Sequence, residues 1–118
     1  MLEVPRLEMP QIGDEDIPNL LVYLGDLGYK FEAGMMDPNA MQVHQAVNWG
    51  KAAALAVTPA AMRKPVLLTQ EPAIIDGNHR HAAHVLTKSP KMGYIKLDMS
   101  FEDALVLLNS FPFAHNVV

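Results

Sequence analysis

The sequence predicts an α+β fold in which a small mixed β-sheet is surrounded by helices. Two segments, 17–27 and 101–108, repeat apolar residues at the spacing of an amphipathic helix. Two short apolar runs, 66–69 and 73–76, have the composition of strands and are separated only by a short turn, which predicts a β-hairpin. A further run, 94–99, alternates polar and apolar residues and is expected to add another strand.

The first helix is expected over 17–27. Asp14 or Asp16 can cap its start, and Pro18 is tolerated because the first helical turn does not use that backbone N–H. Gly28 follows the last apolar position and is a suitable stop.

A second helix is predicted to begin at Asp37, where an acid is followed by Pro38, the residue favoured at the first helical position. We expect it to continue through the alanine-rich stretch, with a break near Gly50. Thr58 and Pro59 then predict a turn or a one-turn helix.

The C-terminal part is expected to alternate helix, strand and helix. The hairpin leads into a helix over 78–87, and a loop joins that helix to the strand at 94–99. Ser100 is placed to cap the last helix, and Pro112 is expected to end it.

Composition limits the class of protein. The chain has 118 residues, half of them hydrophobic, and is expected to form one domain, 1–118. It has no cysteine, which excludes disulfides, thiolate metal sites and cysteine nucleophiles. The N-terminal segment carries charges and prolines where a signal peptide needs an apolar run, and no apolar stretch is long enough to span a bilayer. We therefore expect a cytoplasmic protein that does not act in a membrane.

The charges are unevenly distributed along the chain. The formal net charge is −4, and the acids concentrate in 1–37, whereas 79–96 contains four bases and no acid. Tight binding of duplex DNA needs many phosphate contacts, and a confined basic zone on an acidic protein suits a small anion better. We expect no tight binding of duplex DNA. A homodimer is considered because so short a chain is half hydrophobic.

The most informative segment is AIIDGNHRHAAHV, at 73–85. A strand leads into Asp76 and Gly77, and the chain then continues directly into a helix. The first backbone N–H groups of a helix have no helical partner, and with the positive end of the helix dipole they form a ready anion site. Gly77 permits a positive φ and the close approach of a ligand. An ordinary capped turn is the structural alternative, and the residues alone do not separate the two.

The side chains of this turn fit a phosphate site. Arg80 provides a permanent charge on a planar fork of donors, and His79 can donate to an oxygen or move a proton near neutral pH. Asp76 is suited to holding a metal, accepting a ribose hydroxyl or capping the helix. We therefore expect Gly77, Asn78, His79 and Arg80 to bind phosphate, with Asp76 and His79 as the catalytic candidates.

Three histidines follow the turn with the spacing H-x-H-x-x-H, which raises the question of a metal. His81 and His84 share one side of the expected helix, whereas His79 points elsewhere, and no carboxylate pair has ligand spacing nearby. We therefore expect no metal site here. His84 stands one helical turn after Arg80, where it either lines the anion site or faces water.

The segment PVLLTQEPAIIDGNHRHAAHVL, at 65–86, resembles the core of the ParB/sulfiredoxin-like superfamily, whose hairpin delivers an [I/V]-[I/V]-D-G-x-x-R-x-x-A turn to a helix. Within that superfamily the turn is most similar to the D-G-H-H-R turn of free-serine kinases, with Asn78 at the first variable position. The resemblance implies that a nucleotide, ATP or ADP with Mg²⁺, places its phosphates on this turn. Sulfiredoxin has its catalytic cysteine here, so this chain is not expected to repair sulfinic acids. Partition proteins of the ParB type carry further segments that this sequence lacks.

Three functions stay open at this point. The first is nucleotide binding with phosphotransferase or NTPase activity, and the second is a non-catalytic module of phage or mobile-element type that acts on a host protein. The third, a ParB-like nuclease, would need clustered metal carboxylates and a broad basic surface, and neither is evident in the sequence. Nucleotide binding is the function we expect, because it uses the confined basic zone and the turn together.

Overall fold

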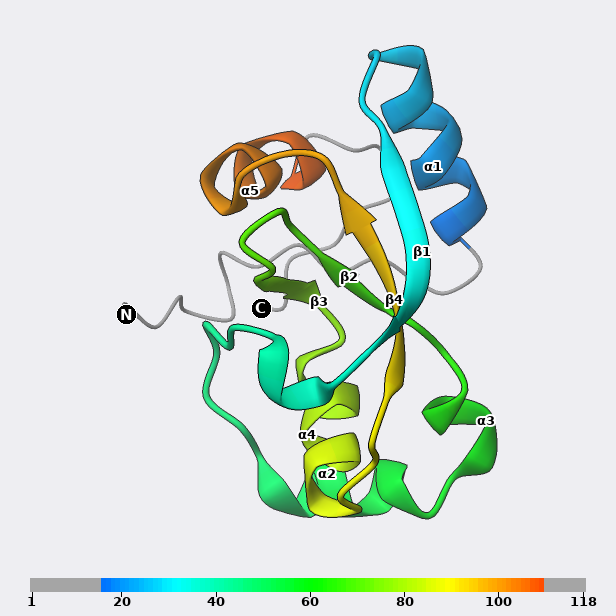
Figure 1. Ribbon diagram of the computed structural model, residues 1–118, viewed down its shortest axis with the longest axis vertical. Helices are drawn as coiled ribbons and strands as arrows, with labels where there is room; N and C mark the ends of the chain where they lie inside the picture. Colours follow the sequence, from blue (N-terminus) through cyan, green and yellow to red (C-terminus); the bar gives the residue numbers. More distant parts are fainter. Residues whose placement is uncertain (1–15, 110–118) are drawn as a thin grey trace.

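The computed structural model describes residues 16–109 and confirms a small α+β fold with a mixed β-sheet. The sheet crosses the middle of the molecule, with helices packed around it (Figure 1). In chain order the elements are α1 (Ile17–Asp26), β1 (Phe31–Met36), the 3₁₀ turn η3 (Pro38–Ala40), α2 (Trp49–Ala56), α3 (Pro59–Met62), β2 (Val66–Leu68), β3 (Ile74–Asp76), α4 (Asn78–Leu86), β4 (Met92–Leu97) and α5 (Phe101–Asn109).

The four strands lie in the order β1-β4-β2-β3. β1 and β4 are antiparallel over six residue pairs, from Phe31 opposite Leu97 to Met36 opposite Met92. β2 and β4 are parallel, and β2 and β3 form the antiparallel hairpin that the sequence predicts. The peptide bond between Glu71 and Pro72 in the hairpin turn is cis.

Each face of the sheet contributes to an apolar cluster. On one face Leu67, Ile75 and Leu97 pack with residues of α1 and α5, among them Leu20 and Leu108. On the other face lies a second cluster, formed by Met41, Val66, Leu68, Ile74 and Met92. α4 follows β3 and packs closely against α2, so the turn that precedes α4 lies between the sheet and the segment from η3 to α3 (Figure 1).

Several predicted elements are confirmed with small changes in their bounds. The helix expected at 17–27 is α1, the helix expected at 78–87 is α4, and α3 follows Thr58 as a single turn. Asp16 stands at the N-cap of α1 without a side-chain cap hydrogen bond, while Ser100 Oγ accepts from Asp103 N at 3.2 Å as predicted. Asp14 and Pro112 lie outside the described residues.

Between residues 28 and 58, one strand was not predicted and one prediction is wrong. No element was assigned to Phe31–Met36 from the sequence, yet β1 is part of the sheet. The helix expected from Asp37 ends after η3, and 41–48 is an extended loop before α2. The loop forms a bridge to the hairpin instead, because Gln42 N donates to Pro72 O at 2.9 Å and Gln42 O accepts from Ile74 N at 2.9 Å. These long-range bonds replace the helical bonds that local sequence favours.

Candidate anion site at the start of α4

The turn has the backbone geometry expected of a helix start that can meet an anion. Asp76 ends β3, and Gly77 adopts a left-handed conformation with φ 97° and ψ 26°. The first helical hydrogen bond runs from His81 N to Gly77 O at 2.9 Å. Because Gly77 has no side chain, the N-cap residue gives α4 no side-chain cap hydrogen bond.

The fold itself requires a glycine at position 77. A Cβ added to Gly77 would lie 2.7 Å from Val66 Cγ1 and 3.3 Å from Val66 Cα, and the φ of 97° is itself unfavourable for other residues. The glycine is therefore explained by its packing against β2. Its presence gives no independent evidence for a ligand.

Asn78 is directed into the protein. Its exposed fraction is 5%, and its Nδ2 donates to Ala46 O at 3.2 Å in the loop that precedes α2. Its Oδ1 is buried and has no hydrogen-bond partner among the described residues. This oxygen is an acceptor and is unsuited to a phosphate, so the contact with Ala46 is the role that the structure supports for Asn78.

His79 is half-buried and contacts the same loop. Asn48 N donates to His79 Nε2 at 3.1 Å. Because Nε2 accepts this hydrogen bond, the neutral imidazole carries its proton on Nδ1, where it is a donor. Asn48 also caps α2, since its Oδ1 accepts from Lys51 N at 3.1 Å. The orientation of His79 is thus coupled to the start of α2.

Arg80 is also half-buried, and it contacts the segment that leads into β2. Its Nη1 donates to Pro65 O at 2.7 Å. A guanidinium has five N–H groups on a rigid planar fork, so the contact with Pro65 O restricts the orientations open to the rest of the group. Arg80 therefore holds a permanent positive charge in a defined position beside the start of α4.

The later histidines of α4 support the fold. His81 Nε2 lies 2.7 Å from Pro38 O, while His84 Nε2 lies 3.0 Å from Met62 O and His84 Nδ1 lies 2.9 Å from Ser89 Oγ. The interpretation that His84 faces water is wrong, because its exposed fraction is 7%. Both of its ring nitrogens have partners, so the structure gives no support to an anion-binding role for His84.

Burial sets the protonation of these two histidines. It lowers the pKa of His81, and the nearby His84 adds to that effect, although the hydrogen bond with Pro38 acts in the opposite direction. Burial likewise lowers the pKa of His84, with the charge of Arg80 contributing and the contact with Met62 opposing it. Both side chains are therefore neutral at physiological pH.

Five polar side chains of α4 thus contact the backbone of the segment from Pro38 to Pro65. The pairs are Asn78 with Ala46, His79 with Asn48, Arg80 with Pro65, His81 with Pro38, and His84 with Met62. Sequence reasoning treated most of these side chains as ligand groups and missed this structural role. A sequence signal did exist, since so many polar residues on one short helix beside a sheet require buried partners.

Glu71, in the hairpin turn, also has a structural role that sequence reasoning missed. Phe101 N lies 3.1 Å from its Oε1 and 3.0 Å from its Oε2, so the carboxylate caps the start of α5. Burial alone would raise the pKa of Glu71, but hydrogen bonds from Phe101 N–H and the Thr69 hydroxyl hold it below its usual value. The hairpin turn is thereby connected to the last helix.

Two hollows on the surface lie apart from the turn. One, of about 380 Å³, is lined by Lys30, Phe31, Glu32, Gln70, Lys96, Leu97 and Asp98. The other, of about 270 Å³, is lined by Ile17, Pro18, Lys64, Pro65, Leu67 and Ile95. Neither includes Gly77–Arg80, although Pro65 lines the second and also accepts the hydrogen bond of Arg80.

Within 16–109, no three histidine or carboxylate side chains gather closely enough to hold a metal ion. In the same range, no helix has the length and apolar character that crossing a membrane requires. Comparison with protein families, with curated proteins and with solved structures gives no match for this chain.

Proposed function

We propose that this chain binds a nucleotide such as ATP or ADP, with a phosphate group placed on the turn Gly77–Arg80. The supporting observation is that α4 begins at a left-handed glycine and has no side-chain cap. Uncapped N–H groups and the positive end of the helix dipole attract an anion. The resemblance of 65–86 to the ParB/sulfiredoxin-like superfamily supports the same proposal, and membership of that superfamily is part of it.

In this proposal the side chains of the turn have different roles. Arg80, which contacts Pro65 O, supplies the charge, and His79, which contacts Asn48 N, supplies a directional polar group. Asn78 is buried against the loop 41–48, so we assign it to support. The phosphate is then expected to approach on the side where His79 and Arg80 are half-exposed, since the side of Asn78 is covered.

Nucleotide turnover is a separate question from nucleotide binding, and a substitution of Asp76 can distinguish the two. Mg²⁺ in nucleotide sites is commonly held by one or two carboxylates and by the phosphates themselves, so it needs no cluster of three protein ligands. If the chain is a phosphotransferase or NTPase, Asp76→Asn abolishes turnover while nucleotide binding in the absence of Mg²⁺ is retained. If it is a binding module, the wild type shows no turnover at all.

Calorimetric titration with ATP and with ADP, each with and without Mg²⁺, tests the proposal. Removing a charge-assisted hydrogen bond costs about 1.5–3 kcal/mol, so Arg80→Ala should weaken binding roughly 10- to 150-fold. Lys91→Ala is the matched control, because it removes one positive charge from an exposed position beyond the far end of α4. It should leave affinity nearly unchanged.

A second variant guards against a purely structural effect of Arg80. Arg80→Lys keeps the charge but loses the planar fork, and its circular dichroism spectrum shows whether the fold survives. We expect a folded protein with intermediate affinity. A folded wild type that binds neither nucleotides nor inorganic phosphate would refute the proposal, as would equal losses in Arg80→Ala and Lys91→Ala.

A further inference from the structure

Strand β1 (Phe31–Met36) is an edge of the sheet and is paired only with β4 among the described residues. Its six residue pairs with β4 are regular, without a bulge, and the strand contains neither proline nor lysine. Natural sheets usually protect such edges with charges, prolines, bulges or covering segments, because an open edge pairs readily with another strand. In this chain the edge carries Glu32 as its single charge.

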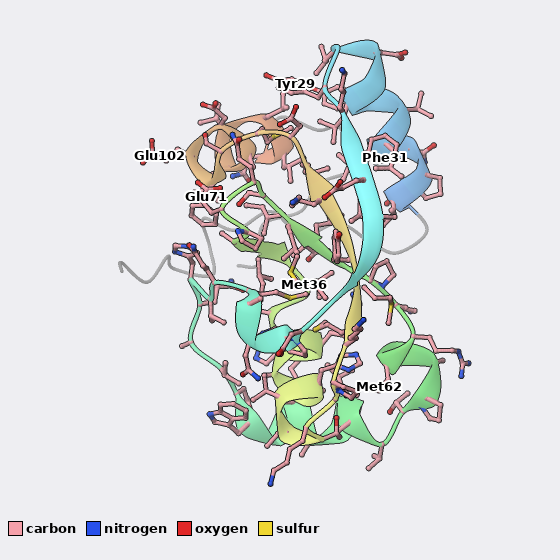
Figure 2. The ribbon with its side chains drawn as sticks, in the orientation of Figure 1. Tyr29, Phe31, Met36, Met62, Glu71 and Glu102 are labelled. Carbon is pink, nitrogen blue, oxygen red and sulfur yellow. The ribbon has the colours of Figure 1, made fainter. Side chains whose placement is uncertain are left out.

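The side chains of this edge are apolar and exposed. Phe31 is 45% exposed and Met35 is 62% exposed, with the small exposed Ala33 between them on the same face. Tyr29, just before the strand, is 38% exposed. Figure 2 labels Phe31 at the start of the strand and Met36 at its end, and Tyr29 just before the strand. Phe31, Ala33 and Met35 therefore form one exposed, largely apolar row on one face of β1.

We infer that β1 is a self-association edge, which pairs antiparallel with β1 of a second copy of this chain about a two-fold axis at Ala33. The two four-stranded sheets then join into one continuous sheet. In this register Ala33 faces its own copy, and each Phe31 faces Met35 of the other chain. A phenyl ring beside a thioether is a favourable contact, and the two-fold axis makes it twice.

Charge selects this register over its neighbours. Directly opposed residues of antiparallel strands lie on the same face of the sheet, so the two-fold axis passes through a residue. Within Phe31–Met36, an axis at Ala33 or at Gly34 opposes five residues of each strand, whereas an axis at Glu32 opposes only three. An axis at Glu32 places two carboxylates directly opposite each other, which is unfavourable. An axis at Gly34 places Glu32 against Met36 of the other copy. The axis at Ala33 avoids both, because it places Glu32 against Gly34.

The surroundings of Glu32 complement the same register. Within one chain Glu32 Oε1 lies 3.0 Å from Lys96 Nζ. Tyr94 extends across Gly34, since its hydroxyl oxygen lies only 2.8 Å from where a Cβ on Gly34 would stand. In the dimer, Gly34 faces Glu32 of the second copy. The Tyr94 hydroxyl is then placed to donate to that carboxylate, which Lys96 of its own chain already neutralises.

The expected dimer is weak. A single pair of six-residue strands buries less than the roughly 1,200 Å² that stable interfaces need, so we expect dissociation in the micromolar range or above. Sedimentation of a concentration series should therefore move from the 13.0 kDa monomer toward the dimer. Met35→Lys should shift the chain to the monomer at every concentration, because it places a charge opposite Phe31.

The matched control is Val57→Lys, at an apolar position that is 81% exposed and lies outside the sheet. This variant should sediment as the wild type does. A wild type that stays monomeric at its highest soluble concentration overturns the inference. Loss of the dimer in Val57→Lys but not in Met35→Lys overturns it as well.

The absence of cysteine allows a direct test of the register. Directly opposed residues have Cα atoms about 4.5–5.5 Å apart, within the reach of a disulfide, whereas Glu32 and its copy would be diagonal and beyond the usual limit of about 7 Å. Ala33→Cys should therefore form a disulfide dimer on mild oxidation, and Glu32→Cys should not. Cross-linking of Glu32→Cys at the same rate, or none in Ala33→Cys, contradicts the proposed axis.

Discussion

Replacing Gly77 by alanine should destabilise the protein more than the same change at any glycine with open surroundings. Two separate costs meet at this residue. The backbone is left-handed, at φ 97°, and the added Cβ would lie 2.7 Å from Val66 Cγ1 and 3.3 Å from Val66 Cα. The methyl group of the Val66 side chain can move, but the Cα belongs to β2 and is fixed by the sheet.

The magnitude follows from these two costs. A left-handed conformation costs a non-glycine residue about 1–2 kcal/mol, and forcing an extra carbon into a packed core costs about 1–3 kcal/mol. Gly77→Ala should therefore lower the free energy of unfolding by about 2–5 kcal/mol. Since domains of this size are stable by only about 5–15 kcal/mol, the loss is a large fraction of the total.

Urea denaturation followed by circular dichroism measures this loss, and two other glycines separate its parts. Gly28 has a φ of 87° with no atom within 4 Å of its added Cβ, so Gly28→Ala reports the backbone cost alone. Gly25 lies in α1 and has equally open surroundings, so Gly25→Ala should stabilise the protein by about 0.5–1 kcal/mol.

A double variant examines the contact with Val66. Val66→Ala removes the nearest atom, so Gly77→Ala should cost less in that background than in the wild type. If Gly77→Ala is no more destabilising than Gly28→Ala, the packing explanation of Gly77 is refuted. The conformation of the turn would then be the only reason for the glycine.

The remaining predictions concern polar contacts. Burial lowers the pKa of His81 and of His84 below 6.5, so as the pH falls these histidines are protonated in the unfolded chain before they are in the folded protein. The free energy of unfolding should therefore be constant above about pH 6.5 and fall below it. A flat profile down to about pH 5.5 would contradict this. Glu71→Gln weakens the cap on Phe101 N–H and should lower the free energy of unfolding by about 0.5–2 kcal/mol at pH 7. The difference from the wild type should shrink as the pH falls below 4.5, because the Glu71 carboxylate is then protonated. A difference that stays constant with pH would show that the charge is irrelevant. Asn48→Ala removes the cap of α2 and should cost about 0.5–2 kcal/mol in urea denaturation, whereas no loss would show that the cap contributes nothing.

The elements that the sequence predicts correctly are those with a local signal. The apolar spacing of α1 places Leu20 and Leu24 on one side of a helix, and both are buried against the sheet. The hairpin has two apolar runs joined by a proline-containing turn, and a glycine separates the end of β3 from the start of α4. Each of these patterns is complete within about a dozen residues, so no distant contact is needed to specify it.

The missed elements depend on distant contacts. The six residues of β1 are mostly exposed, so they lack the alternation of buried and polar positions that marks a strand, and pairing with β4 stabilises them. The segment after Asp37 leaves its helical path because Gln42 pairs with the hairpin. Local helix propensity is worth only a few tenths of a kcal/mol per residue, and tertiary hydrogen bonds override it.

The sequence predicts the backbone conformation of the candidate site but not the contacts of its side chains. The strand, the left-handed glycine and the helix start all follow from Asp76–Gly77 and the residues around them. That Asn78 would contact Ala46, and His84 would contact Met62, depends on the path of the loop and of α3, which no local pattern reveals. Polar side chains near a helix start are therefore weak evidence for a ligand until their partners are known.

The most direct test of the proposed function is a titration of ¹⁵N-labelled protein with ADP, followed through the backbone amide signals. Binding at the turn should shift the N–H signals of Gly77, His79 and Arg80 together, along one saturable curve, because these groups face the phosphate. Adenosine, which has no phosphate, should leave these signals in place. If ADP leaves the signals of the turn unchanged at millimolar concentration, or shifts only residues far from α4, the start of α4 is a structural turn and not an anion site.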